Sequence, residues 1–157
     1  MADINKTDSD NIAGSVLVEF CDLLSIAGIP DAVDNTVDES LILLVTAAAW
    51  DKFYGSPETV LITISPENSN AGHIWNVSLK LRYPKDSASV TNTFISMARH
   101  TYLIKLTDAN GIKKLLGSRD NPMRMVFEIL NPGEMSGYNG YQVEFKSAYT
   151  KPPYYLI

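Results

Sequence analysis

The sequence has little of the residues that most often carry catalytic or cross-linking chemistry. It contains one cysteine, Cys21, and two histidines, His73 and His100. A single cysteine excludes an internal disulfide and a zinc site built on cysteines. The histidines are not spaced as a metal-binding pair such as His-x-x-x-His, and His100 is better explained as a favourable charge at the end of a helix. Because Cys21 lies in an apolar run, a buried and unreactive thiol is favoured.

Motifs of the common enzyme classes are also missing. There is no Gly-x-Ser-x-Gly nucleophile elbow and no glycine-rich phosphate loop. Residues 108–111 resemble the start of a calcium loop, but Lys113 and Lys114 follow where further ligands are needed, so a turn is favoured. Glu128 and Glu144 are expected on the solvent sides of strands, which favours hydrated surfaces over a catalytic pair. We therefore predict a protein that is not an enzyme and that holds no metal or cofactor.

Long apolar runs and an excess of basic residues are absent as well. No apolar run reaches about 18 residues and no basic region precedes one at the N-terminus, so we expect a soluble protein made inside the cell, without a membrane partner. The net charge of −5 argues against a general nucleic-acid-binding protein. Residues 1–60 carry eleven acidic and two basic residues, whereas residues 61–157 carry seven acidic and eleven basic residues. This division favours a bipolar surface or contact between copies of the chain.

The second half of the sequence contains a series of strand patterns. Asp108-Ala109-Asn110-Gly111 separates two short apolar runs, and Asn-Gly is a strong hairpin signal because both residues tolerate the positive φ of a tight turn. Two further runs alternate between apolar and polar residues. The pattern predicts a meander of four strands, at residues 102–107, 112–117, 123–130 and 141–146.

Two more strands and one helix are predicted before the meander. Residues 74–83 alternate regularly, which predicts one buried and one hydrated face. Residues 59–65 predict another strand, and residues 66–72 predict a loop. A helix is predicted at residues 88–99. Its expected cap is Ser87 or Ser89, and its expected inward-facing residues are Val90, Phe94 and Met97.

The two ends of the chain are less regular. Residues 1–11 are polar and aperiodic, which predicts a flexible arm. Residues 12–29 fit a helix or a strand. Residues 40–53 are apolar at nearly every position, which fits a strand buried on both sides or a buried helix, with a strand favoured at the start. At the other end, Pro152 and Pro153 exclude a central strand.

Together these patterns predict an α+β fold that is mostly β. The expected architecture is a β-sandwich or a partly closed barrel with one flanking helix, formed by residues 12–157 as a single domain behind the flexible arm at residues 1–11. The residues expected in its core are Trp75, Leu79, Leu81, Phe127, Val143 and Phe145.

Two groups of residues are candidates for contact with other molecules. Tyrosines can stack on sugars or on a neighbouring protein, although tyrosines also close the ends of barrels. The acidic segment at residues 31–39 and the basic residues of the meander carry opposite charges. If they lie on opposite flanks, copies of the chain can join through different patches and close a ring; solubility alone explains the acids nearly as well. The candidate interface residues are Asp31, Asp34, Asp38, Glu39, Lys113, Lys114, Arg119, Arg124, Tyr138, Tyr154 and Tyr155.

Two segments resemble a family of proteins from phages and prophages of Bacteroides-like bacteria. They are Tyr102-Leu-Ile-Lys-Leu-Thr-Asp-Ala-Asn-Gly111 with Leu115-Leu-Gly-Ser118, and Ser136-Gly-Tyr-Asn-Gly-Tyr-Gln-Val-Glu-Phe145. The resemblance implies a structural protein of the virion tail or neck (tube, terminator, connector or baseplate) with the fold of tail-tube and connector subunits, which form rings. The implied partners are further copies and other virion proteins, with DNA only passing through a lumen. Synthesis in the host bacterial cytoplasm and assembly into the virion would follow.

A hypothesis from another class stays open beside this one. The chain could be a soluble β-sandwich binding module whose tyrosine- and glycine-rich loops bind a glycan or a host protein. Rings or tubes in the electron microscope favour the virion subunit, and a monomer that binds glycans favours the binding module. An enzyme is the weakest of the three.

Overall fold

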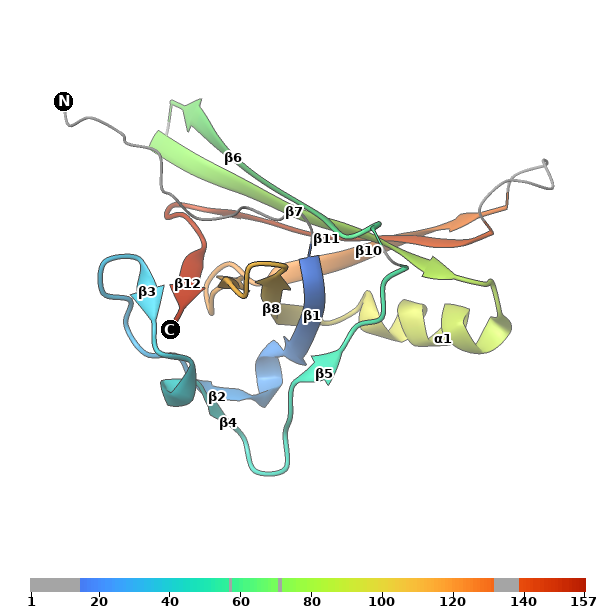
Figure 1. Cartoon of the computed structure of the whole chain (residues 1–157), viewed down its shortest axis with the longest axis horizontal. Helices are drawn as coiled ribbons and strands as arrows, with labels where there is room; N and C mark the ends of the chain where they lie inside the picture. Colours follow the sequence, from blue (N-terminus) through green and yellow to red (C-terminus); the bar gives the residue numbers. More distant parts are fainter. Residues whose placement is uncertain (1–14, 57, 71, 132–138) are drawn as a thin grey trace.

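The computed structural model describes residues 15–56, 58–70, 72–131 and 139–157 (Figure 1). Strands predominate in this part of the chain and accompany one α-helix, which confirms the prediction of a mostly-β fold with a single helix. The predicted arm at residues 1–11 lies outside the described residues. The strands are β1 (Ser15–Asp22), β2 (Ile26–Gly28), β3 (Thr36–Val37), β4 (Leu43–Leu44), β5 (Asp51–Lys52), β6 (Leu61–Ser69), β7 (Gly72–Pro84), β8 (Thr101–Asp108), β9 (Lys113–Leu116), β10 (Met123–Leu130), β11 (Gly140–Tyr149) and β12 (Tyr154–Leu156); the helix is α1 (Ala88–Met97), and η1 (Leu23–Ser25) and η2 (Glu39–Leu41) are short 3-10 helices.

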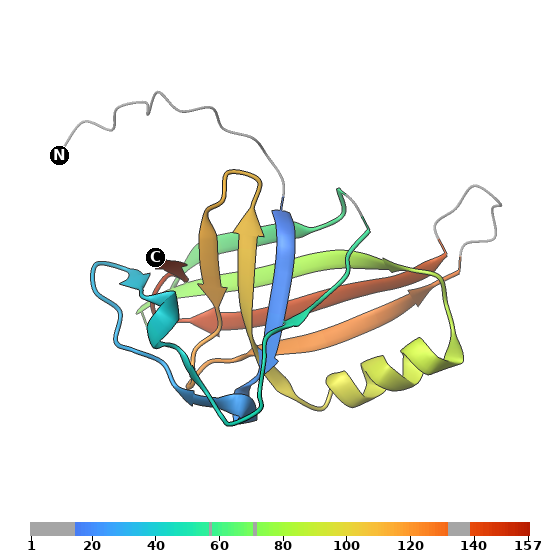
Figure 2. The same ribbon diagram turned by 60° about the horizontal axis from the view of Figure 1, so that its bottom comes forward.

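Most of these strands belong to one sheet that bends back on itself. Its order is β3-β12-β9-β8-β10-β11-β7-β6, with β1 paired to β8 and β5 paired to β1. The long strands β10, β11, β7 and β6 form one half, and the strands of the other half cross them steeply and pack against them (Figure 2). The described strands of this sheet do not close into a barrel. The finer choice between a sandwich and a partly closed barrel stays a prediction.

The bend lies where the chain passes from β9 to β10. β9 pairs with residues 104–107 of β8, and β10 pairs with residues 101–102. Between the two strands, Gly117 has a φ of +98°, and a Cβ atom at this position would lie 2.8 Å from Cδ2 of Leu103. Glycine therefore fits this turn, and a larger residue would have to displace the β8 side chain.

The predicted order of the four-stranded meander is wrong. β10 returns to β8 and then pairs with β11, while β9 pairs with β12 as its other neighbour. Alternation of apolar residues identifies the two faces of a strand, but it does not determine which edge the next strand occupies. Here the turn at Gly117 leads the chain from β9 to the first residues of β8, where β10 continues along the same edge.

The inner core lies between the two halves of the sheet. β8 contributes Tyr102, Ile104 and Leu106, and β7 and β11 contribute alternating residues from the other half. The polar residues between them on β7 are mostly exposed, so the predicted buried and hydrated faces are confirmed. Of the predicted core residues, Leu79, Leu81, Val143 and Phe145 are at most 1% exposed, and Trp75 and Phe127 are partly buried against the same core.

The predicted helix is confirmed and covers the end of the long strands that the other half leaves open (Figure 2). Oγ of Ser87 accepts a hydrogen bond from the backbone N–H of Val90, 3.3 Å away, as expected of a cap. Phe94 is buried against Tyr141, with 5.0 Å between the ring centroids. The Tyr141 hydroxyl donates to the carboxylate of Asp86, so β11 also fixes the start of the helix.

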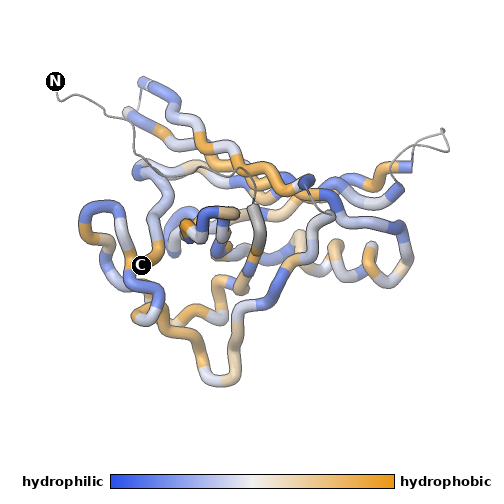
Figure 3. The backbone as a smooth tube through the Cα atoms, in the orientation of Figure 1, coloured by the Kyte–Doolittle hydropathy of each residue, from blue (hydrophilic) through white to orange (hydrophobic). Residues whose placement is uncertain are grey.

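Residues 23–50, apart from β3 at the edge of the sheet, form an outer layer on the opposite face of β8, β9 and β12. Figure 3 shows hydrophobic stretches along β2 and β4, on the side of β1 away from the long strands. These stretches enclose a second, smaller cluster, the outer core. Its buried members are Cys21, Ile26, Val37, Ile42, Leu103, Leu115 and Leu156.

The outer layer corrects the prediction for residues 40–53. That segment is neither a continuous buried strand nor a helix, because it contains only part of η2 and the two-residue strands β4 and β5. Leu41 and Leu43 are 55% and 60% exposed, while Ile42 between them enters the outer core. Ala47 has a φ of +68°, which interrupts the extended backbone. For the ambiguous residues 12–29, the long pairing of β1 with β8 selects a strand.

Two further predictions fail at prolines. The predicted loop at residues 66–72 is largely strand, because β6 continues through Pro66 to Ser69 and pairs with β7. β6 is the last strand of the sheet, and an edge strand tolerates a residue without an N–H. At the C-terminus, β12 lies between β9 and β3 although Pro152 and Pro153 precede it. Both prolines lie before the first residue of β12, so every residue of the strand keeps its backbone N–H for pairing.

Candidate functional site

The candidate interface residues Glu39 and Lys113 belong to one ion-pair cluster on the outer face of the sheet. At its centre, Lys105 of β8 is 7% exposed. Its Nζ atom lies 2.8 Å from Oε1 of Glu39 and 3.3 Å from Oε2 of Glu19, and 4.6 Å from the centroid of the Trp50 ring. Nζ of Lys113 lies 2.6 Å from the other carboxylate oxygen of Glu39. The cluster joins the outer layer to β1, β8 and β9.

The charges of this cluster stabilise one another. Hydrogen bonds from Lys105 and Lys113 hold the pKa of the Glu39 carboxyl below its ordinary value. The same carboxylate raises the pKa of Lys113. Two ammonium groups face two carboxylates in this cluster, so its charges are paired. The arrangement suits attachment of the outer layer to the sheet.

The expectation that acidic and basic candidates lie on opposite flanks is wrong for Glu39 and Lys113, because they pair within one molecule. Arg119 is also engaged internally, since Nη2 donates to the backbone carbonyl oxygens of Ile26 and Ala27, each 3.1 Å away. The reason is the position of β12, which brings the acidic segment beside β9. Contact with other molecules stays a prediction for all the candidate residues.

The remaining interface candidates differ in position. Asp31, Asp34, Asp38 and Arg124 are exposed. On β12, Tyr154 is half-buried, and Tyr155 is 44% exposed beneath Nζ of Lys114, which lies 5.6 Å from its ring centroid. Tyr138 lies outside the described residues. The aromatic group is therefore split between the outer core and the surface.

The cysteine and the two histidines, which most often carry catalytic or metal-binding chemistry, lie in different surroundings in the structure. Cys21 is 2% exposed, as predicted, and burial raises the pKa of its thiol. Nδ1 of His100 lies 2.5 Å from Oδ2 of Asp22, so the imidazole lies beside β1 as well as at the end of α1. His73 is exposed near the edge of the Trp75 ring. Within the ranges that the structure describes, no group of three or more histidine, cysteine and acidic residues is arranged to hold a metal ion.

The long half of the sheet has two open edges, which sequence reasoning did not identify. No described strand pairs with the outer side of β6, or with β10 beyond Arg124. Leu61 on β6 and Val126 on β10 are 59% and 42% exposed. Both lie in one row across the face of the long strands that points away from the inner core. Along this row Leu61 is opposite Lys80, Lys80 is opposite Glu144, and Glu144 is opposite Val126. The only sign of these edges in the sequence was an apolar residue at a position where the strand pattern predicts exposure to solvent, Leu61 and Val126.

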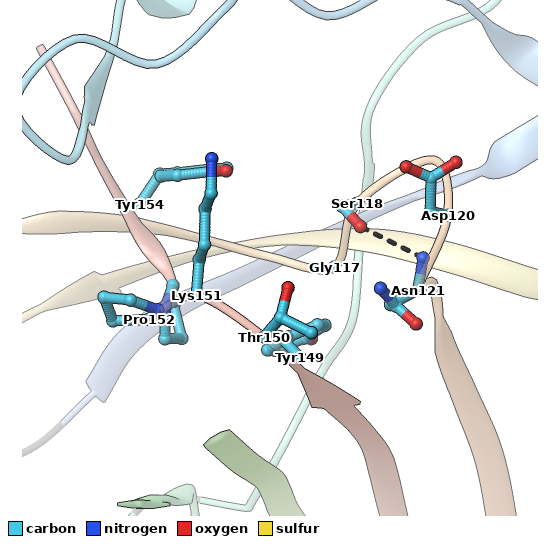
Figure 4. Close-up of a pocket in the computed structure, with 10 residues that line it drawn as sticks. Gly117, Ser118, Asp120, Asn121, Tyr149, Thr150, Lys151, Pro152 and Tyr154 are labelled. Carbon is cyan, nitrogen blue, oxygen red and sulfur yellow. Dashed lines mark hydrogen bonds between the residues drawn. The ribbon is translucent and has the colours of Figure 1, made fainter. Parts of the chain in front are cut away.

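A polar pocket of about 190 Å³ lies at the bend of the sheet, between the β9–β10 loop and the segment that joins β11 to β12. In Figure 4, Lys151 and Tyr154 stand on one side, Asp120 and Asn121 on the other, and Thr150 lies between them. We call this the corner pocket. Burial raises the pKa of Tyr149, which also lines it, to about 12, so the hydroxyl of that residue stays protonated.

In comparisons with known proteins, the chain matches no family model, no curated protein and no solved structure. The described part of the chain includes no helix with the length and hydrophobicity that a membrane crossing requires.

Proposed function

We propose that this protein is a non-enzymatic structural subunit that assembles into a closed ring through the two open edges of its long strands. The observation that carries the proposal is the pair of edges at β6 and β10, each with an exposed apolar residue in the same row. The sequence resemblance assigns such a ring to the tail or neck of a phage virion. Further copies and other virion proteins are then its partners, DNA passes only through the lumen, and the host bacterial cytoplasm is the site of synthesis.

Strand direction supports joining these two edges. β10, β11, β7 and β6 alternate in direction, because each neighbouring pair is antiparallel. In a row of four alternating strands, the first and last run in opposite directions. When two copies stand the same way up, β6 of one copy is therefore antiparallel to β10 of the next. This contact uses different edges of each copy, as a closed ring requires.

The side chains along the edges support the same pairing. In the register of the row, Leu61 of one copy lies beside Val126 of the next. An apolar pair opposite each other on neighbouring strands stabilises a sheet by about 0.2–1 kcal/mol, and pairing also satisfies the open backbone groups. Every contact between neighbouring copies in the ring would contain one such side-chain pair and one set of backbone hydrogen bonds between β6 and β10. The outer face remains polar and hydrated around the new pair.

Charge substitution at the edges tests the proposal. We expect the wild-type protein to form rings, seen by light scattering and electron microscopy, and Leu61→Lys to weaken them, because an edge lysine opposes pairing. Adding Val126→Glu to that variant places opposite charges across the contact and restores assembly. Leu24→Lys is the control, since Leu24 is 83% exposed and belongs to η1 in the outer layer rather than to the long strands. A monomeric wild-type protein, or equal effects of Leu61→Lys and Leu24→Lys, contradicts the proposal.

A further inference from the structure

We propose that the corner pocket binds one hexuronic acid residue of a polysaccharide. This inference does not depend on ring assembly, because the pocket lies at the bend of the sheet and uses neither open edge. It rests on three features of the pocket: a fixed backbone, side chains whose polar groups face one space, and opposite charges on its two walls.

One wall of the pocket, the β9–β10 loop, is held in place by hydrogen bonds within the loop and to neighbouring strands. Next to Gly117, the backbone N–H of Asn121 donates to Oγ of Ser118 at 3.0 Å. The Asn121 carbonyl oxygen accepts from Ser118 N–H at 3.1 Å and from Oγ of Ser147 at 3.3 Å. Arg119 anchors the same loop to β2. On this wall a ligand thus meets a backbone that is already ordered, which lowers the entropic cost of binding.

The side chains that line the pocket keep their hydrogen-bonding capacity. Within the described part of the chain, Asp120, Thr150 and Lys151 have no side-chain hydrogen bond or ion pair, and the amide of Asn121 has none. They include a carboxylate, a hydroxyl, an ammonium and an amide group. Together they can both donate to and accept from a ligand within one small space.

The arrangement of these groups fits an acidic sugar. Vicinal sugar hydroxyls both donate and accept, which suits Asp120 and Asn121 on one wall. Lys151 on the opposite wall can form a charge-assisted hydrogen bond to the ligand carboxylate. Tyr154 supplies apolar surface for the C–H groups of the ring. The volume of about 190 Å³ is smaller than the sites of drug-sized ligands, so a single ring is expected.

An NMR titration with sodium glucuronate tests the assignment on the full chain. We expect saturating shifts at the backbone amides of Ser118, Asn121, Thr150 and Lys151. Lys151→Met should weaken glucuronate binding about tenfold, the effect of losing one hydrogen bond to a charged group, and leave binding of neutral methyl glucoside unchanged. Asp120→Asn should weaken both sugars. Lys146→Met removes an exposed lysine outside the pocket and should change neither.

Four results overturn the proposal. The first is the lack of saturating shifts at the pocket. The second is shifts of equal size with sodium acetate, which would show attraction of any carboxylate. The third is tighter binding of glycine, which would assign the two charged walls to a zwitterion. The fourth is equal effects of Lys151→Met and Lys146→Met. Melting temperatures of the variants separate loss of binding from loss of folding.

Discussion

The two faces of β8 are both buried, but different interactions hold the layers that cover them. On the inner face, Tyr102, Ile104 and Leu106 enter the large apolar core between the halves of the sheet. On the outer face, Leu103 enters a smaller core, and Lys105 forms ion pairs with two glutamates. Large apolar area thus joins the halves, whereas the outer layer depends on a small core and a charge cluster. We expect the outer layer to open more easily than the halves separate.

The largest effect is expected in the inner core. Phe145 is fully buried, so Phe145→Ala should lower the free energy of unfolding by about 3–5 kcal/mol, and Phe127→Ala by less because Phe127 is partly exposed. Ile42→Ala in the outer core should instead increase hydrogen exchange mainly in residues 23–50. Denaturant unfolding and native-state hydrogen exchange measure the two effects. An even loss of protection across the sheet in Ile42→Ala would show that the layers open together.

Substitution of Gly117 at the bend should lower stability more than substitution of Gly111 in the β8–β9 turn. Gly117→Ala places a methyl group against Leu103 and forces alanine into a positive φ, which should cost about 1–3 kcal/mol of stability. Gly111→Ala is the matched control, because Gly111 also has a positive φ but its added Cβ meets no atom within 4 Å. Thermal unfolding of the two variants compares them. Equal losses would assign the effect to backbone conformation alone.

A smaller, pH-dependent effect is expected in the charge cluster. The pKa of Glu39 is lowered in the folded protein, so its contribution to stability is present above its ordinary pKa of 4.5 and is lost as the pH falls through the lower folded value. Glu39→Gln should lower the unfolding free energy at pH 7 by about 1 kcal/mol and flatten its fall in acid.

Urea unfolding from pH 7 to pH 3 measures this difference. Glu128→Gln, at an exposed position of β10, is the control and should follow the wild-type protein. A constant gap between Glu39→Gln and the wild-type protein at every pH would contradict a role for the Glu39 charge.

The same contrast explains which parts of the fold could be predicted from sequence. Residues 74–83 and the helix at residues 88–99 were predictable because one face of each packs on the inner core, which leaves a regular apolar pattern. The outer layer has no such pattern, since Ile42 is buried while Leu41 and Leu43 are exposed. Its order comes from contacts with β8, β9 and β12, which are distant in the sequence.

The candidate site was predicted less well than the core. Charge counting identified Glu39 and Lys113, but it assigned them to contact between copies because pairing through β12 was not visible in the sequence. The corner pocket combines residues 117–121 with residues 149–154, and no local pattern joins those segments. The open edges depend on strand order, which alternation does not determine.

Disulfide cross-linking tests the central claim, ring closure through β6 and β10, most directly. Leu61→Cys and Val126→Cys are combined with Cys21→Ala, which removes the native thiol. Within one copy the two new cysteines are three strand spacings apart, about 14 Å, beyond the roughly 7 Å between Cα atoms that a disulfide spans. We predict a ladder of cross-linked species that ends at a closed ring on oxidation, and no ladder from either cysteine alone beyond a dimer. A double variant that stays monomeric under oxidation contradicts the account.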